Sequence, residues 1–355
     1  MKISAAADPG ALLGTDMVPL ARAGQATAYR ATMTEVATFA SASAAAGLNN
    51  VGRNLLHNSA FAIAQRGNGP FTANGSYTAD RWQLIYQLDT VSVQLPALTD
   101  ANRAQIGDES AVQCLINTFT GNAGAAAFSS VVQKIESARR LSGKTVTVSF
   151  WATAGSGTPK LGVSLDQNMG TGGSPSAAVF GNGQSVTTSI TATRYSLTFA
   201  LASLSGKTLG TNGDDNTQLN FWYSSGTTQA ARAGSIGVQS GAIWIWGVQL
   251  EIGSVATQLE KPEIRYDVAN CQRFYQIGVI LGEGYGVAGT PVVVGVTSQC
   301  ALRSASPTLV VTNNANANLS GSALSGTVGL FYASGTVAAT GNWTVNLQFN
   351  ASADL

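Results

Sequence analysis

The stretch that decides the fold is GAIWIWGVQLEIGSVATQLEKPEIRYDVANCQRFYQ, Gly241–Gln276. It opens as a predicted strand, in which alternate residues point to opposite faces. The two sets are Ile243, Ile245 and Gly247 on one face and Trp244, Trp246, Val248 and Leu250 on the other. Both faces are apolar, which is typical of a strand buried on both sides in a sandwich. The strand is expected to end at Gly253, and Pro262 disfavours helix just before it, so an extended hinge follows.

Short strand patterns recur on both sides of this stretch, separated by turns rich in Gly, Ser and Asn. Upstream strands are expected at Leu55–Ala64 and near Thr90, Ala111, Val146, Lys160, Tyr195 and Thr217. This spacing predicts an all-β chain, with an antiparallel jelly-roll sandwich over residues 53–264 and a small C-terminal β domain over residues 265–355.

Two local details of the sandwich can be predicted. In the strand from Ala111, the residues Val112, Cys114 and Ile116 are expected to share one face. Residues 80–82 are expected to form a corner, with Arg81 bonded to a carboxylate or to carbonyls and Trp82 packed beneath it.

Residues 1–52 are rich in Ala and Thr and differ from the rest of the chain. The segment Gly14–Gly24 is expected to form a hairpin-like element. A helix is expected from Thr32 to Gly47, because Thr32 and Glu35 have the spacing of a capping box. Its single apolar stripe must dock on another surface.

Composition restricts the function. Charged residues make up only 10% of the 355 residues, against about 25% in ordinary soluble proteins, and the net charge is +1. A chain with so few charged residues has little electrostatic repulsion to keep its copies apart, so we expect an obligate assembly. There is no basic block for nucleic acid, no secretory signal, and no apolar run of the ~18 residues that a membrane span needs.

Metal and cofactor chemistry are not expected. Cys114, Cys271 and Cys300 are far apart in sequence and odd in number, so buried reduced thiols are more probable than disulfides or a zinc site. His57 is the only histidine, and we interpret it as a packed or exposed residue and not as a catalytic base.

Several short motifs, in this order, resemble those of bacteriophage tail-fibre and related virion proteins. They are NLLHNSAFAIAQRG at 54–67, YTADRWQL at 77–84, WGVQLEIG at 246–253, CQRFYQ at 271–276, QCALRSASPT at 299–308 and ASADL at 351–355. Phe274 stands where that group usually has Tyr. The resemblance implies an N-terminal segment that attaches to other virion proteins, a carbohydrate-binding-like jelly roll, a homotrimer at the virion surface, and host surface polysaccharide as the ligand.

An enzyme that cleaves polysaccharide is the pertinent alternative, and it needs two carboxylates ~5–10 Å apart. Neither Asp108–Glu109 nor Asp214–Asp215 is a suitable pair, because adjacent strand residues point to opposite faces and both pairs are expected in turns. Glu251 is expected to pair with Arg265 or Arg81. We therefore predict no enzymatic activity.

Sugar binding needs flat aromatic rings and short polar side chains. The candidate residues are Trp151, Trp222, Tyr223, Asn168, Asn182, Asp214 and Asp215. Aromatic residues on sandwich strands are more often core than platform, and Trp244 and Trp246 are expected in the core. Three functions stay open at this point: a receptor-binding fibre, a structural or decorating fibre of the head or tail, and a depolymerase.

Overall fold

The structure is a computed structural model that describes residues 17–20, 29–32 and 52–355. Two compact units are present, Met1–Val51 and Gly52–Leu355, so the predicted boundary at residues 264 and 265 lies inside the second unit. No helix among the described residues is long and apolar enough to cross a membrane.

In the first unit, β1 (Met17–Leu20) pairs antiparallel with β2 (Tyr29–Thr32). The predicted hairpin within Gly14–Gly24 therefore contains β1, but its partner strand lies further along the chain. The helix is predicted from Thr32 to Gly47. Thr32, its predicted cap, is the last residue of β2, and residues 33–47 lie outside the described residues.

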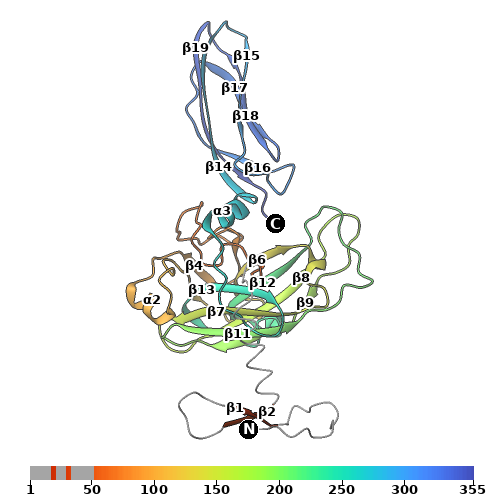
Figure 1. Ribbon diagram of the computed structural model, residues 1–355. Helices are drawn as coiled ribbons and strands as arrows, with labels where there is room; N and C mark the ends of the chain where they lie inside the picture. The colour runs from red at the N-terminus through yellow and green to blue at the C-terminus, as the bar shows by residue number, and fades with distance from the viewer. Residues whose placement is uncertain (1–16, 21–28, 33–51) are drawn as a thin grey trace, which may run out of the picture. The chain divides into compact units, whose positions relative to one another are not determined.

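The second unit begins with the predicted antiparallel sandwich, which confirms the all-β fold class (Figure 1). One sheet has the order β10-β8-β12-β6-β3, with β9 paired to β8, and the other has the order β11-β7-β13-β5-β4. The first sheet comprises β3 (Trp82–Gln87), β6 (Phe128–Glu136), β8 (Lys160–Asn168), β9 (Val179–Phe180), β10 (Gln184–Thr187) and β12 (Asn216–Ser225). The second comprises β4 (Thr90–Gln94), β5 (Leu115–Thr120), β7 (Thr145–Ala154), β11 (Thr193–Ala200) and β13 (Ser240–Ile252).

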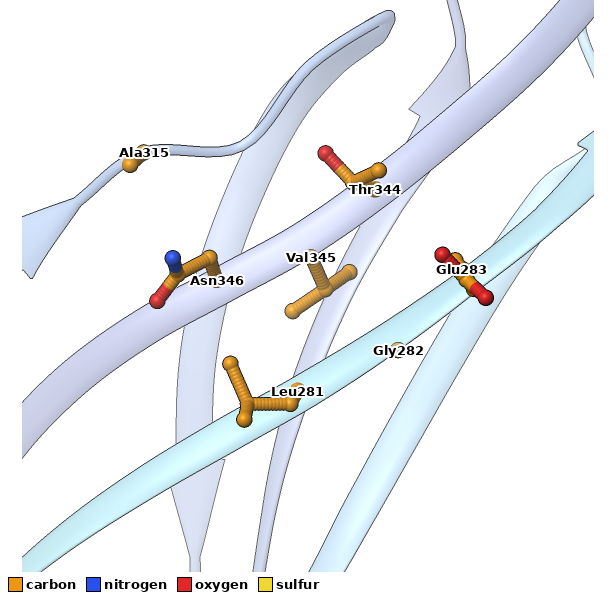
Figure 2. A pocket seen from close by; sticks show the side chains of 7 residues that line it. All are labelled: Leu281, Gly282, Glu283, Ala315, Thr344, Val345 and Asn346. Atoms are coloured by element: carbon orange, nitrogen blue, oxygen red, sulfur yellow. The ribbon is translucent and has the colours of Figure 1, made fainter.

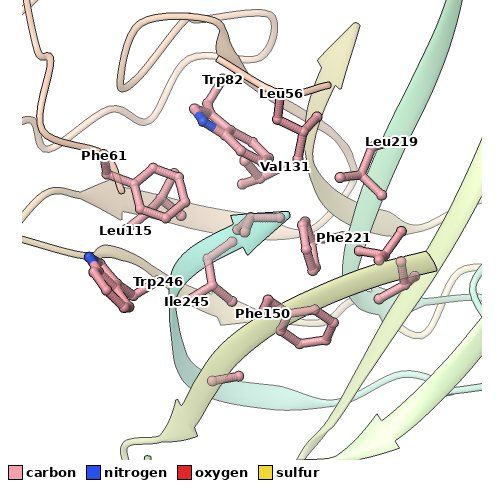
Figure 3. Packing of buried hydrophobic residues seen from close by; sticks show 14 of the residues in the cluster. Leu56, Phe61, Trp82, Leu115, Val131, Phe150, Leu219, Phe221, Ile245 and Trp246 are labelled. Atoms are coloured by element: carbon pink, nitrogen blue, oxygen red, sulfur yellow. The ribbon is translucent and has the colours of Figure 1, made fainter. Parts of the chain in front are cut away.

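Large apolar side chains from both sheets fill the space between them (Figure 3). Phe150 of β7 meets Phe221 of β12 edge-on, with ring centres 5.0 Å apart. Trp82 of β3 is fully buried beside Phe221 at 6.2 Å. The short helices α2 (Asp100–Ile106), η1 (Ala138–Leu141) and η2 (Thr227–Gln229) lie in the connections.

β13 is the two-sided buried strand that the sequence predicts, but its two faces are not the predicted ones. Gly247 has a left-handed backbone, with φ of 59°, and inserts one extra residue. As a result Trp246 lies opposite Trp151, whereas Leu250 lies opposite Val148, on the other face of β7. Trp244 and Trp246 are buried as expected, but they do not share a face with Leu250.

Two further strand predictions are wrong. Residues 55–64 form an irregular loop, because Asn58 and Phe61 have positive φ and the Asn58 amide bonds both the N–H and the C=O of Ile63. In β5 the buried positions are those of Leu115, Asn117 and Phe119, while Val112 precedes the strand and is exposed.

The predicted corner at residues 80–82 is present. Arg81 has a φ of 74° and donates to the carbonyl of Lys134 at 2.6 Å, above the buried Trp82. The Glu251 prediction is wrong, since its ion-pair partner is Arg53, at 4.0 Å. Arg265 pairs with Glu263 instead.

After the hinge, α3 (Ile264–Gln272) leads into a second, smaller sandwich of two three-stranded sheets. One sheet has the order β14-β19-β16 and the other β15-β18-β17. Their bounds are β14 (Tyr275–Gly286), β15 (Pro291–Thr297), β16 (Thr308–Asn314), β17 (Leu319–Gly326), β18 (Leu330–Val337) and β19 (Gly341–Ser352). Phe331 and Phe349 form its centre, with ring centres 4.8 Å apart.

Charged and aromatic groups join the two sandwiches of this unit. Arg66 pairs with Asp80 in the jelly roll and with Asp354 at the end of the second sandwich, and its guanidinium lies 3.5 Å from the centre of the Tyr275 ring. Burial raises the pKa of Asp80 to about 6. These ion pairs and the cation–ring contact pack the two sandwiches against each other within the unit.

The three cysteines are free thiols. Cys114 and Cys271 are buried as predicted, and burial raises the pKa of both. Cys300 is only half-buried, which corrects the expectation for that residue.

Candidate functional site

The outer face of the six-stranded sheet is polar along its two central strands. Leu161, Val163 and Leu165 of β8 point into the core, so the intervening residues face outward. The outward row of β8 is Ser164, Asp166 and Asn168, and the facing row of β12 is Asn216, Gln218, Asn220 and Trp222. Hydroxyls, amides and a carboxylate therefore alternate along these rows. Most of them are buried under the loops that cross this face, and Asn168 and Gln218 are the half-buried members.

One exposed aromatic ring stands over this polar face. Phe180 of β9 lies opposite Asp166 and is 57% exposed. The guanidinium of Arg232 lies 4.2 Å from the centre of the Phe180 ring and 5.1 Å from that of Trp222. Trp222, Arg232 and Phe180 thus form a stack in which Phe180 is the member that solvent reaches.

A buried carboxylate holds the stack in place. Asp166 is 1% exposed and accepts from Arg232 at 2.6 Å and from the Asn220 amide at 2.9 Å. The backbone N–H of Gly181, next to Phe180, also donates to Asp166, at 3.2 Å. Asp166 thus holds both Arg232 and the backbone next to Phe180, so the ring and the cation beneath it are positioned by one buried group.

Free polar groups flank the ring. Asn182 is exposed and forms no hydrogen bond with any described residue. Gln218 is half-buried, and its side-chain nitrogen donates to Asn220 at 2.6 Å. Its side-chain oxygen, Oε1, has no partner among the described residues. An apolar ring with amide donors and acceptors beside it has the chemistry that a sugar ring and its hydroxyls require.

The structure contradicts the prediction that Trp222 and Tyr223 are binding platforms. Trp222 is 2% exposed, because Arg232 and Ala233 cover it and its indole N–H donates to Ser164 at 2.9 Å. Tyr223 is fully buried in the core on the opposite face of β12. The prediction identified the correct strand, but Phe180 is the exposed ring.

Asn168, Asp214 and Asp215 are brought together, as the end of the polar face. Asn168 donates to Asn216 at 3.1 Å. Asp214 accepts from the backbone and the hydroxyl of Thr171, at 2.7 and 2.6 Å, and the Thr171 hydroxyl bond is the main cause of its lowered pKa. Asp215 accepts from the backbone of Ala138 at 2.8 Å. Both carboxylates hold turns, as their expected turn position implies.

Trp151 lies on β7, in the other sheet, and is therefore separate from these residues. It is half-buried, with its ring centre 5.4 Å from that of Trp246 and 4.9 Å from the guanidinium of Arg194. Its outward row on β7 also contains Thr147 and Ser149, which pair with Thr198 and Ser196 of β11, so Trp151 has polar neighbours of its own on the other sheet. Its ring is less exposed than that of Phe180.

His57 is placed where it stays neutral. Burial, followed by the charges of Arg81, Arg140 and Arg273, lowers its pKa to about 4. No described hydroxyl, thiol or carboxylate is hydrogen-bonded to its ring. Within the described part of the chain, no group of three or more His, Cys, Asp or Glu side chains is arranged to hold a metal ion.

Sequence reasoning missed Phe180, Arg232 and Asp166. The segment VFGNG, residues 179–183, places an aromatic residue directly before a Gly/Asn turn, and this was the available signal. The contribution of Arg232 had none, because it lies 66 residues from Asp166 in the chain.

No protein-family model and no curated protein matches this chain. Solved structures with a similar fold include tailspike protein 4 of bacteriophage CBA120, described as its enzymatically active domain, at 16% identity and a TM-score of 0.31. The match covers 56% of this chain and 21% of the tailspike, so this chain spans about a fifth of it.

Two matches are to whole binding proteins. A family 11 carbohydrate-binding module of Clostridium thermocellum is 10% identical with a TM-score of 0.31, and the match covers 53% of this chain and 96% of the module. A putative sugar binding protein of Bacteroides thetaiotaomicron is 14% identical with a TM-score of 0.35, and the match covers 57% of this chain and 100% of that protein.

Proposed function

We propose that this chain is a non-enzymatic fibre protein of a phage or phage-like virion that binds host surface glycan through the Phe180 face. The observation that carries the binding proposal is the exposed Phe180 ring, which stacks on Arg232 of the Arg232–Asp166 pair. Among the described residues, the unpaired side-chain amide of Asn182 lies two residues further along, and the unpaired Oε1 of Gln218 lies on the other side of Asp166. The ordered sequence motifs support the virion assignment. In this proposal the N-terminal segment attaches the chain to other virion proteins.

Each part of the face has a role in this proposal. A pyranose ring stacks on the outer side of Phe180, because Arg232 already occupies the other side. The Asn182 amide donates to and accepts from its hydroxyls, and the Oε1 of Gln218 accepts from them. A single stacked sugar binds weakly, and a homotrimer presents three such sites at a high effective concentration.

The test is binding of the purified full chain to host polysaccharide, measured by calorimetry for wild type and Phe180→Ala. Loss of one stacking contact of about 1.4 kcal/mol weakens binding about tenfold. Tyr266→Ala is the matched control, because Tyr266 is also exposed, at 61%, and also has an arginine over its ring, Arg265 at 5.2 Å. The control is expected to bind as wild type does.

The two alternatives give different results in the same experiment. A structural or decorating fibre shows no saturable binding by the folded wild-type protein. A depolymerase releases new reducing ends from the polysaccharide during incubation. Equal binding by wild type and Phe180→Ala contradicts the proposed site even when the chain binds glycan.

A further inference from the structure

The outer face of the β14–β19–β16 sheet carries an unusual row of exposed apolar side chains. Along β14 these are Ile277 and Val279, both 43% exposed, Leu281 at 67% and Tyr285 at 71%. Alternate residues of a strand share a face, so all four lie on the side away from the sandwich core. Isolated exposed apolar residues are ordinary, whereas a contiguous row marks a surface that another molecule covers.

The inner side of β14 has the opposite character. Four of its inward positions are glycines, and a Cβ at Gly278 would lie 2.3 Å from the Phe349 ring. The four are Gly278, Gly282, Gly284 and Gly286. Only Ile280 supplies a large apolar side chain to the core from the middle of this strand. A strand with small residues inward and bulky apolar residues outward has its main apolar face away from its own domain.

The neighbouring strand completes this face with neutral polar groups. Its outward residues, paired with those of β14, are Asn342, Thr344, Asn346, Gln348 and Asn350. Between the two rows lies a hollow of about 420 Å³, with Leu281 and Glu283 on one side and Thr344 and Asn346 beside them (Figure 2). Apolar and amide groups are thus arranged in parallel lines.

Charge is nearly absent from this sandwich. Residues 275–355 contain Glu283, Arg303 and Asp354 as their charged side chains. Asp354 pairs with Arg66, and Arg303 donates to the carbonyls of Ala353 and Gly213, so both belong to the junction. Glu283 is the charge that stays on the outer face. A face with one charge gives little electrostatic preference for a charged partner, and a contact with another copy has to leave Glu283 at its margin, in water.

We propose that this face packs against the same face of the other copies of the chain, around the three-fold axis of the homotrimer in the proposed function, on which this inference rests. The twelve-residue strands β14 and β19 make a face about 40 Å long and about 10 Å wide, and the seven residues of β16 add a strip about 24 Å long. Two such faces bury about 1,000 Å² in total, which just reaches the roughly 1,000 Å² that a stable biological interface needs. The inference does not depend on whether the chain binds glycan.

The geometry of such a contact explains the composition of the two rows. The exposed side chains of β14 would supply the apolar centre, and the amides of β19 would form hydrogen bonds at its margin. Leu281, the most exposed aliphatic residue of the row, would become buried.

The test is the oligomeric state of the full chain, measured by light scattering with size-exclusion chromatography over a range of concentrations. Leu281→Lys and, from the neighbouring strand, Asn346→Lys are expected to raise the dissociation constant at least tenfold. Val293→Lys is the matched control, because Val293 is also 67% exposed and lies on the other sheet, in β15. The control is expected to assemble as wild type does.

Three results would overturn the proposal. These are a monomeric wild type at every concentration, a Leu281→Lys variant that assembles as wild type does, and a Val293→Lys variant that dissociates to the same extent as Leu281→Lys. Because Leu281 is exposed, its substitution leaves the core intact, and an unchanged melting temperature of the isolated variant verifies this. Glycan binding by Phe180 is measured separately, so failure of the glycan site is distinguishable from failure of this interface.

Discussion

His57 gives the sharpest quantitative prediction, because it is the only histidine and its surroundings disfavour its charged form. It borders a small hollow of about 90 Å³ at the junction of the two sandwiches, together with Arg81 and Phe274. The ring centres of His57 and Phe274 are 6.2 Å apart. Burial is the largest cause of its lowered pKa, and Arg81 is the next.

The sign of the effect follows from proton binding. In the folded protein His57 stays neutral down to its pKa of about 4, while in the unfolded chain it takes up a proton near 6.5. Between these values the unfolded state binds more protons, so the contribution of His57 to the free energy of unfolding rises with pH. Across the window the contribution amounts to about 3 kcal/mol.

The perturbation is His57→Gln, which cannot titrate. The assay is urea denaturation of both proteins at closely spaced pH values from 4 to 7. The free energy of unfolding of wild type minus that of the variant should rise by about 3 kcal/mol over this range. Asp80 has the opposite sign, since its raised pKa of about 6 gives a contribution that is present at low pH and lost as pH rises through 6. The contribution of Asp80 is the same in wild type and in the His57→Gln variant, so it cancels in the difference between them.

A flat difference between pH 4 and 7 would refute the reasoning. It would mean that folded His57 protonates as easily as the unfolded residue, and hence that water or a counter-charge reaches the ring. A difference that falls with rising pH would mean that the folded protein stabilises the protonated ring.

Three substitutions test separate parts of the packing, each by denaturation against wild type. Thr99→Ala removes the hydroxyl that accepts from the backbone N–H of Asn102 at the start of α2, and should lower the free energy of unfolding by about 1 kcal/mol. An unchanged free energy of unfolding would show that this cap does not stabilise the protein. Gly162→Ala should cost about 1–3 kcal/mol of stability and weaken glycan binding, because its Cβ would lie 2.2 Å from the Ala233 carbonyl in the loop that carries Arg232. A variant as stable as wild type would show that this loop moves aside at no cost. Tyr223→Phe should stabilise the protein by about 1 kcal/mol, since its buried hydroxyl has no partner among the described residues, and a loss of stability would reveal a bound water.

Local patterns were sufficient for the fold class and for most strands. Alternation of apolar and polar residues identified the strands near Thr90, Lys160 and Thr217, because burial on one or both faces leaves that signal in any sequence. The same reasoning failed at residues 55–64, where the Asn58 side chain replaces ladder hydrogen bonds by bonds within the loop.

The candidate site was less predictable, for a physical reason. Exposure of an aromatic residue depends on what crosses above it, and alternation alone does not report that. Trp222 points outward as a platform would, but the loop with Arg232 passes over it. Phe180 sits on a strand of only two residues, too short for any periodic pattern. Its position depends on Asp166 and Arg232, which only the fold brings together.

The extra residue at Gly247 has a consequence for the exit of the chain from the jelly roll. It moves Gln249 and Glu251 to the same side of β13 as Trp246, where they bond the backbone of Thr257 and Glu260. That hinge leads directly to α3 and the second sandwich. Without this one residue, the side chains that follow it on β13 would point to the opposite face of the sheet. A single inserted residue therefore sets the direction in which the C-terminal quarter of the protein leaves the jelly roll.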